Sequence, residues 1–246
     1  IGNDPDYKHK VFPALREVPA GTGKGPEKNY VSLWEEKQSV EWLLAKKRAM
    51  GTVIFDSQYQ NDTKAMQGKI FRYEHIRYYD TLPDKVVVFQ GIDLAISKKA
   101  TADYFCIATV ARDEFGRVYV IDVYKDRLSF LQQTNKIVEK AGQFNPRRVY
   151  IESNQYQSAQ VELVSAISNV PVKPIITDSD KVSRAWKFSA KFENGQIFFP
   201  RFGVQDLIDN LVRFPDCVHD DDFDALEIAV MSTFGKLKKA RKDFGV

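Results

Sequence analysis

Hydrophobic positions are densest along Val86 to Ala95, where the run VVVFQGIDLA leaves neither face of an extended chain polar. Such a run is typical of a strand that is buried on both faces. One carboxylate, Asp93, interrupts the run near its end. Because an isolated ionised carboxylate in a low-dielectric core is strongly destabilising, we expect Asp93 to have charged partners or a bound metal ion.

The hydrophobic pattern then predicts a regular succession of elements. Residues 103–112 and 117–124 are rich in β-formers and are joined by DEFG, in which Gly116 suits a positive φ. With the first strand they predict an antiparallel meander of three strands. Downstream, the pattern predicts helices over 129–141, 157–168, 207–214 and 225–234, and strands over 147–152 and 170–176. This order indicates an α/β domain with a mixed sheet.

The front third carries a weaker pattern. Residues 1–29 are rich in proline, glycine and charge and are expected to be loop or disordered. The GTGKG stretch within them lacks the spacing of a phosphate-binding loop. A helix is predicted over 39–50, capped by Ser39 and ended by Gly51, followed by a short helix over 54–60 and an extended segment over 70–79. We therefore expect a partly disordered appendage over 1–84 and the main domain over 85–246.

Composition narrows the class of protein only slightly. The 246 residues have a net charge of +3, and no apolar run approaches the roughly 18 residues of a membrane span. Cys106 and Cys217 stand far apart without a CxxC motif, which argues against a zinc site and for a reducing compartment. No signal peptide opens the chain, which begins at Ile1, so we expect it to be part of something longer.

Three antiparallel strands followed by alternating helices and strands is the ribonuclease H-like order, in which the fourth strand lies parallel beside the first. Asp93 and Glu152 would then meet where both strands end. If the last helix starts near Asp220, Asp221 and Asp224 share one face of its first turn.

Converging carboxylates favour Mg²⁺ or Mn²⁺, and two ions roughly 3.5 to 4 Å apart could activate water and stabilise the leaving oxygen of a phosphodiester. Simpler readings remain open. The acidic HDDDFD segment suits a solvated helix start, and Glu152 alone could be a strand-end charge. Asp103 could support the site from behind or merely begin a strand, and His219 could touch phosphate or be structural.

Basic residues in two places suggest contacts with a phosphate backbone. Lys98 and Lys99 follow the first strand, and Lys181 opens a segment in which three further cations have helical spacing. The candidate DNA-binding residues are Lys98, Lys99, Lys181, Arg184, Lys187 and Lys191. A solvated helix face is the alternative, and the tail KLKKARK could add non-specific attraction or be a disordered end.

Four motifs occur in the order GIDLA, YIESNQYQ, DKVSRA and HDDDFDAL. Together they resemble the nuclease domain of tailed-phage large terminase subunits, and SLWEEKQSVEWLLAKKRAMGTVIFDSQYQND resembles the end of their ATPase domain and the linker behind it. The resemblance implies that Asp93, Glu152 and aspartates of the last motif are the catalytic, metal-binding acids. Asp221 and Asp224 match the acidic motif of the family best, and Asp220 comes next. The additional Asp222 leaves the assignment within this motif open.

The resemblance implies a metal-dependent endonuclease that cuts concatemeric double-stranded viral DNA with little sequence specificity, Asp93 bridging two ions. It also implies the terminase ATPase domain, the portal and the small terminase subunit as partners, and the host cytoplasm as the location, without a membrane. No phosphate-binding loop or acidic Walker B strand is present, so we expect no ATP hydrolysis by this chain. Rival functions are a junction resolvase or integrase-like strand transferase, and a DNA-clamping or coupling module that does not cut.

Overall fold

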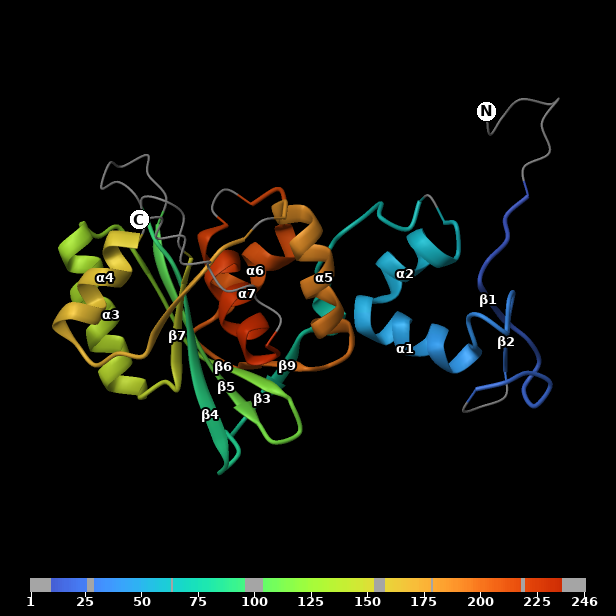
Figure 1. Cartoon of the computed structure of the whole chain (residues 1–246), viewed down its shortest axis with the longest axis horizontal. Helices are drawn as coiled ribbons and strands as arrows, with labels where there is room; N and C mark the ends of the chain where they lie inside the picture. Colours follow the sequence, from blue (N-terminus) through green and yellow to red (C-terminus); the bar gives the residue numbers. More distant parts are fainter. Residues whose placement is uncertain are drawn as a thin grey trace, which may run out of the picture. The chain divides into compact units, whose positions relative to one another are not determined.

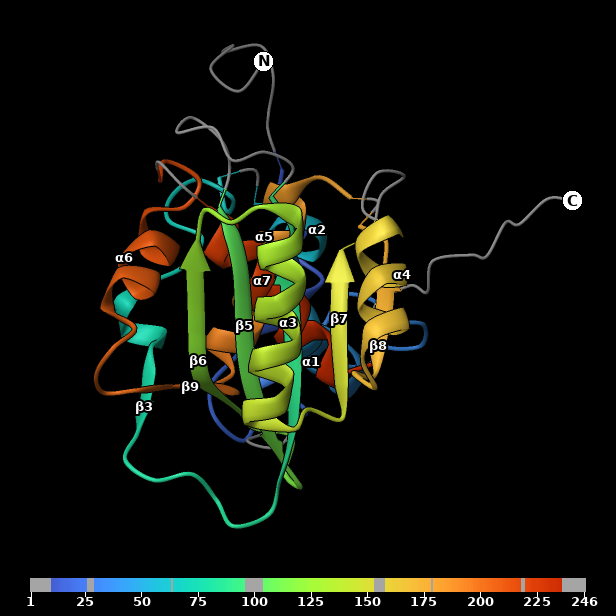
Figure 2. The same ribbon diagram turned by 90° about the vertical axis from the view of Figure 1, so that its left-hand side faces the viewer.

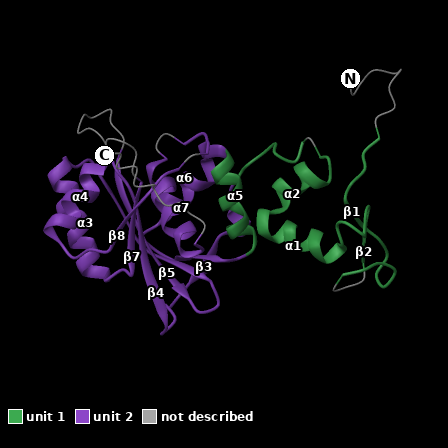
Figure 3. Cartoon of the chain, viewed as in Figure 1, with its two compact units in different colours: residues 1–70, 183–194 green, residues 71–182, 195–246 purple. Residues whose placement is uncertain are grey.

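The computed structural model describes residues 10–25, 29–62, 64–95, 104–152, 158–177, 179–217 and 220–235. The chain forms two compact units, which Figure 3 shows in different colours. Unit 1 comprises residues 1–70 and 183–194, and unit 2 comprises residues 71–182 and 195–246. The sequence analysis placed a boundary at residue 84, between the end of an ATPase domain with its linker and the main domain. That boundary stays a prediction.

The described part of unit 2 is built on a seven-stranded mixed sheet with the order β3-β9-β6-β5-β4-β7-β8 (Figure 2). Its strands are β3 Arg77–Tyr79, β4 Val86–Asp93, β5 Phe105–Asp113, β6 Val118–Asp126, β7 Arg148–Glu152, β8 Val172–Ile175 and β9 Ile197–Pro200. β4, β5 and β6 form an antiparallel meander, and β7 lies parallel beside β4. These relations confirm the predicted ribonuclease H-like arrangement.

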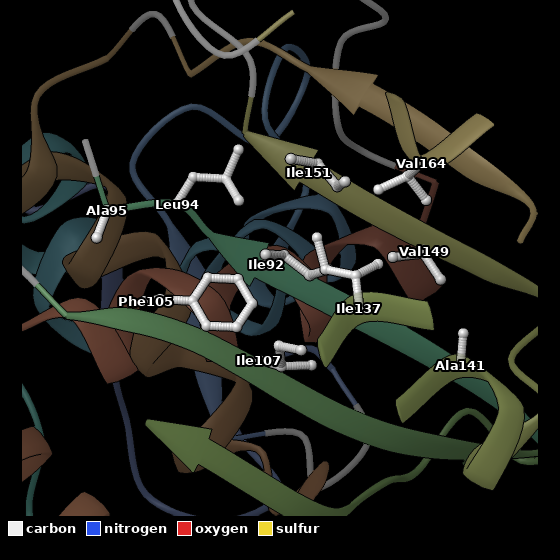
Figure 4. Packing of buried hydrophobic residues seen from close by; sticks show 10 residues of the cluster. All are labelled: Ile92, Leu94, Ala95, Phe105, Ile107, Ile137, Ala141, Val149, Ile151 and Val164. Carbon is white, nitrogen blue, oxygen red and sulfur yellow. The ribbon is translucent and has the colours of Figure 1, made fainter. Parts of the chain in front are cut away.

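Helices cover both faces of this sheet (Figure 1). α3 (Phe130–Phe144) and α4 (Ser158–Ile167) lie on one face, and α6 (Gln205–Arg213) and α7 (Asp221–Thr233) lie on the other. The core under α3 and α4 is the cluster of Figure 4, made of Ile92, Leu94, Ala95, Phe105, Ile107, Ile137, Ala141, Val149, Ile151 and Val164. Burial of these apolar side chains is the main force that holds β4, β5 and β7 against the helices.

The beginning of α3 follows from its sequence. The Ser129 side chain accepts a hydrogen bond from the Gln132 backbone N–H, and the Gln132 side chain accepts one from the Ser129 N–H. This reciprocal capping box satisfies donors that the first helical turn leaves free. The helix ends at Asn145, whose φ of 45° is left-handed. The predicted helix start at Ser129 is therefore confirmed.

α7 approaches β4 unusually closely. A Cβ atom on Gly91 would lie 2.3 Å from the Ala229 backbone nitrogen and 2.4 Å from the Ala225 carbonyl oxygen. Only glycine allows two backbones to come this near. α7 is buried nearly all round, with Ala225, Ile228 and Ala229 fully buried. The helix begins at Asp221, which agrees with the start near Asp220 considered above and lies four residues before the range of 225–234 that the hydrophobic pattern predicted.

The prediction of loop or disorder over residues 1–29 is wrong for part of the described segment. β1 (Leu15–Glu17) pairs antiparallel with β2 (Tyr30–Ser32) in unit 1. Residues 15–17 are ordered because they pair with β2. Local composition does not reveal such a pairing. Residues 1–9 and 26–28 lie outside the described part of the chain.

The two predicted helices of unit 1 are confirmed as α1 (Val40–Met50) and α2 (Thr52–Tyr59). The Ser39 side chain accepts a hydrogen bond from the Trp42 N–H, which caps α1. Gly51 ends the helix with a φ of 83°. Most of α5 (Lys181–Glu193) also belongs to unit 1, and the Glu193 carboxylate accepts a hydrogen bond of 2.9 Å from the Thr52 N–H.

The extended segment predicted over residues 70–79 is only partly correct. Tyr73–His75 forms a single 3₁₀ turn, and only Arg77–Tyr79 forms a strand, β3. β3 pairs in parallel with β9, which sequence analysis missed. Both strands are short, and their pairing joins segments far apart in the chain. No described helix is long and apolar enough to cross a membrane.

The β5–β6 hairpin contains a buried carboxylate whose ionised form is stabilised. Asp113 accepts hydrogen bonds from the Arg117 backbone N–H at 2.8 Å, the Arg117 Nε at 2.6 Å and the Tyr119 hydroxyl at 3.2 Å. Burial opposes ionisation, but the hydrogen bonds from Arg117 and Tyr119 lower the pKa of Asp113 below its ordinary value. The hairpin is therefore more stable when Asp113 is charged.

We expect Asp113→Asn to lower the free energy of unfolding at pH 7 by about 1 to 2 kcal/mol. Because the pKa of Asp113 is depressed in the folded state, its contribution is present above the ordinary pKa of an aspartate and is lost as the pH falls through the folded value. Urea unfolding from pH 7 downward measures this. The exposed neighbour Glu114→Gln is the control. A deficit in Asp113→Asn that stays constant down to strongly acidic pH would contradict the prediction.

Candidate active site

Two acidic side chains meet where β4 and β7 end. Ile92 on β4 is the parallel partner of Ile151 on β7. The next residues, Asp93 and Glu152, are the last of their strands and therefore lie side by side at the carboxyl edge of the sheet. This is the edge at which α/β sheets place ligands.

The first turn of α7 brings further aspartates to the same edge. Asp221 and Asp224 are three residues apart and share one face of the helix, whereas Asp222 points to another side. Their carboxylates also suit the positive end of the helix dipole. All three are buried, with exposed fractions of 6%, 8% and 4% for Asp221, Asp224 and Asp222. The helical period thus separates Asp222 from the other two.

The charges of these acids act on Asp93. Burial raises the pKa of Asp93 well above its ordinary value, and the charges of Asp224, Glu152 and Asp221 raise it further, in that order of size. The Lys181 ammonium acts in the opposite direction. The structure therefore brings Asp93, Glu152, Asp221 and Asp224 together in one group, which we call the acidic cluster.

Lys181 contacts two carboxylates at the start of α7. Its Nζ lies 2.5 Å from Asp220 Oδ2 and 2.5 Å from Asp224 Oδ2. Although burial lowers the pKa of Lys181, the charges and hydrogen bonds of Asp224 and Asp220 raise it overall. The sequence placed Lys181 among the DNA-binding candidates, and its position against the acids was not foreseen.

Lys125, near the end of β6, pairs with the other side of this turn. Its Nζ lies 3.5 Å from Asp222 Oδ2 and 4.0 Å from Asp221 Oδ2. Asn210 on α6 donates a hydrogen bond of 2.8 Å to Asp222 Oδ2. Sequence analysis missed both residues. Lys125 could have been found from its position. It directly follows the predicted strand 117–124, which pairs with the strand next to that of Asp93.

A cavity of about 690 Å³ lies on this side of α7. Its lining includes Tyr104, Lys125, Asp209, Arg213 and Asp222. Lys125 and Asp222, which form an ion pair, therefore also line a polar cavity.

Two more side chains complete the surroundings of the acids. The Thr177 hydroxyl, just beyond β8, donates a hydrogen bond to Glu152 Oε1. Cys106 is the antiparallel partner of Asp93 and is fully buried. Burial, together with the charges of Asp222 and Asp93, raises the pKa of the Cys106 thiol well above its ordinary value, so it stays protonated.

The donor atoms of the cluster suit a hard divalent cation, because Asp93, Glu152, Asp221 and Asp224 offer only carboxylate oxygens. Among the described residues, no three acidic, histidine or cysteine side chains are arranged to hold an ion as they stand. Lys181 is paired with Asp224, and Thr177 with Glu152. The donor set therefore fits a hard divalent cation, and two of its four acids also have partners within the protein.

The remaining candidates stay predictions. Lys98, Lys99, Asp103 and His219 lie outside the described residues, as does the basic tail from residue 236. Arg184, Lys187 and Lys191 lie on α5 in unit 1, whereas the acidic cluster belongs to unit 2. Of these three, Lys187 is exposed and the other two are half-buried.

The sheet order and the acids at its carboxyl edge define a protein of the ribonuclease H-like class. Residues 90–233, more than half of the chain, match the family described as the terminase RNaseH-like domain. The chain therefore belongs to this family, and the resemblance to terminase nuclease domains is confirmed. A search of curated proteins finds no match.

Solved structures show the same fold. The large terminase nuclease of thermophilic phage G20c with bound magnesium is 14% identical, with a TM-score of 0.52 over 67% of this chain and 97% of that chain. The same nuclease with bound cobalt is 13% identical, with a TM-score of 0.50 over the same shares. The large terminase of thermophilic bacteriophage D6E in complex with ATP-γ-S is 10% identical, with a TM-score of 0.59 over 79% of this chain and 52% of that chain.

Proposed function

We propose that this chain is the metal-dependent endonuclease of a viral DNA-packaging terminase, which cuts concatemeric double-stranded DNA with little sequence specificity. The observation that carries the proposal is the acidic cluster at the carboxyl edge of β4 and β7, in a chain of the terminase RNaseH-like family. The large terminase nuclease of phage G20c was solved with bound magnesium and with bound cobalt, which supports the use of a divalent ion.

Each acid has a definite task in this proposal. Asp93 and Glu152 supply oxygens from adjacent strands, and Asp224 and Asp221 supply oxygens from α7. Two bound divalent ions would supply an activated water and stabilise the leaving oxygen of the phosphodiester. Asp222 has another task, because Lys125 and Asn210 hold it on the far side of the helix turn. The role of Asp222 is to fix the orientation of that turn.

The setting of the activity is also proposed. We infer that the chain works with the terminase ATPase domain, the portal and the small terminase subunit, in the host cytoplasm during viral assembly. The D6E comparison supports the first of these partners, since that large terminase was solved with ATP-γ-S and this chain matches about half of it. Tethering to the packaging machinery would select the cut site.

A plasmid assay tests the proposal. Supercoiled DNA is incubated with the purified chain in Mg²⁺, in Mn²⁺ and in EDTA, and nicked and linear products are counted. We expect products with metal and none with EDTA. DNA retention without any cleavage, in every metal and over a range of protein concentrations, would instead favour the clamping module.

Two neighbouring aspartates provide a matched pair for the same assay. Asp224→Asn should lower the cleavage rate by roughly a hundredfold or more, because it removes an anionic oxygen that the proposal assigns to metal binding. Asp222→Asn should keep most of the activity, because its partners are Lys125 and Asn210. Equal losses in the two variants would contradict the assignment of separate tasks.

A further inference from the structure

Lys181 brings a positive charge into direct contact with the acidic cluster. It is the first residue of α5 and follows β8, which runs parallel to β7 and ends at the same edge of the sheet. Lys181 therefore reaches the site from the end of β8, the strand that pairs with β7, which Glu152 ends. Its side chain is only 28% exposed, although lysine side chains are usually solvated.

The first turn of α7 surrounds the ammonium. Carboxylate oxygens of Asp220 and Asp224 each lie 2.5 Å from Nζ, and the centroid of the Phe223 ring lies 5.8 Å from it. Two charge-assisted contacts and a cation–π contact converge on one group. Such a site keeps the lysine in place in the absence of any other cation.

Asp224 is also the acid with the largest effect on Asp93. The ammonium therefore contacts the carboxylate whose charge acts most strongly on Asp93. A divalent ion that takes Asp224 Oδ2 as a ligand, at about 2.0 to 2.6 Å, would lie close to Nζ, which contacts the same oxygen. Two cations that close repel, so the ammonium and the ion compete for the same carboxylate oxygen.

We propose that Lys181 is the internal counter-ion of the site, and that its ammonium must leave Asp224 before a divalent ion binds there. The inference rests on the proposed function, because it takes Asp224 to be a metal ligand. Without metal, Lys181 limits the repulsion among the acids. With metal, it competes with the incoming ion and so sets the metal concentration at which the site fills.

This role has a signature that a purely structural lysine lacks. Removing the ammonium leaves the acids unneutralised, so the metal-free protein becomes less stable. It also removes the competitor, so the affinity for the divalent ion rises. A lysine that only packs the start of α5 against α7 would lower stability without raising metal affinity.

The test compares Lys181→Met with Lys181→Arg after EDTA treatment and dialysis. We expect Lys181→Met to unfold about 3 to 6 °C lower than the wild-type protein without metal. In calorimetric titration with Mn²⁺ it should bind roughly tenfold tighter, which corresponds to about 1.4 kcal/mol. Lys181→Arg keeps the charge and should stay near the wild-type affinity. Lys136→Met, which removes a lysine paired with Glu139 on α3, controls for loss of any lysine.

Unchanged or weaker Mn²⁺ binding by Lys181→Met would overturn the inference and leave the proposed function intact. Lys181→Gln, which can still donate a hydrogen bond to Asp224, takes its place if the methionine variant does not fold, with the same expected rise in affinity. Absence of Mn²⁺ binding by the wild-type protein would overturn the proposed function, and the counter-ion role with it.

Discussion

Asp93→Asn should abolish metal-dependent cleavage of plasmid DNA. Asp93 ends β4 and lies next to Glu152, and the charges of Asp224 and Asp221 also reach it. Asparagine keeps the shape but removes one anionic oxygen and the negative charge. A loss of about 4 kcal/mol of transition-state stabilisation, in the range that metal-ion catalysis supplies, lowers the rate roughly a thousandfold.

The same substitution should leave the fold intact. The carboxylate of Asp93 is repelled by its acidic neighbours, so its replacement by a neutral amide relieves repulsion in the metal-free protein. We expect the unfolding temperature of Asp93→Asn in EDTA to equal or exceed that of the wild-type protein. Loss of cleavage in a protein of undiminished stability would therefore report on chemistry rather than folding.

The opposite end of β4 offers a matched control. Asp84 is exposed and precedes the first residue of the strand, Val86. Asp84→Asn makes the same chemical change away from the cluster and should cut DNA at the wild-type rate. If Asp93→Asn cuts as fast as Asp84→Asn, the active site lies elsewhere in the chain or the cleavage comes from a contaminant.

Gly91→Ala should destabilise unit 2 and disable the site together. The added Cβ would meet the Ala229 nitrogen and the Ala225 carbonyl oxygen at 2.3 and 2.4 Å, and both are backbone atoms of α7. Backbone atoms in a buried helix cannot turn aside as a flexible side chain can, so α7 must move away from β4. Overpacking of this kind costs about 3 kcal/mol, which for a protein of this size lowers the unfolding temperature by roughly 6 to 12 °C.

Movement of α7 also displaces the acids of its first turn. Asp224 reaches Asp93 only because the helix lies directly on β4, so we expect cleavage by Gly91→Ala to fall even at temperatures where the variant is folded. Circular dichroism melting and the plasmid assay measure the two effects separately.

Gly142→Ala is the control for this substitution. Gly142 lies on the exposed side of α3, and a Cβ there meets no atom within 4 Å. Alanine should stabilise the helix by about 0.5 to 1 kcal/mol, since glycine costs that much inside a helix. If Gly91→Ala also stabilises the protein, the close contact between α7 and β4 is wrong.

Local patterns were sufficient for the central elements. β4 is a continuous hydrophobic run, and α3 begins at a capping box formed by Ser129 and Gln132. Each signal lies within one segment, so no knowledge of the rest of the chain is needed to recognise it. β3 and β9 were missed or only partly predicted because they are three and four residues long and are stabilised by pairing with each other.

Strand order was enough to bring Asp93 and Glu152 together, because parallel neighbouring strands end at the same edge of a sheet. Helical spacing was enough to group Asp221 with Asp224. These inferences use only the periods of strands and helices, which a sequence displays directly. The fold class was therefore accessible without coordinates, whereas the choice among the aspartates of residues 220–224 was not.

The pairing of Asp222 and Asp224 with cations depended on the folded chain. Asp222 is held by Lys125 from β6, and Asp224 by Lys181 from the start of α5. These partners come from elements that are far apart in sequence, and the side to which each carboxylate turns depends on how α7 packs on the sheet. Periodicity within one segment carries no information about such contacts. The cation partners of these two aspartates are therefore decided only by the tertiary structure.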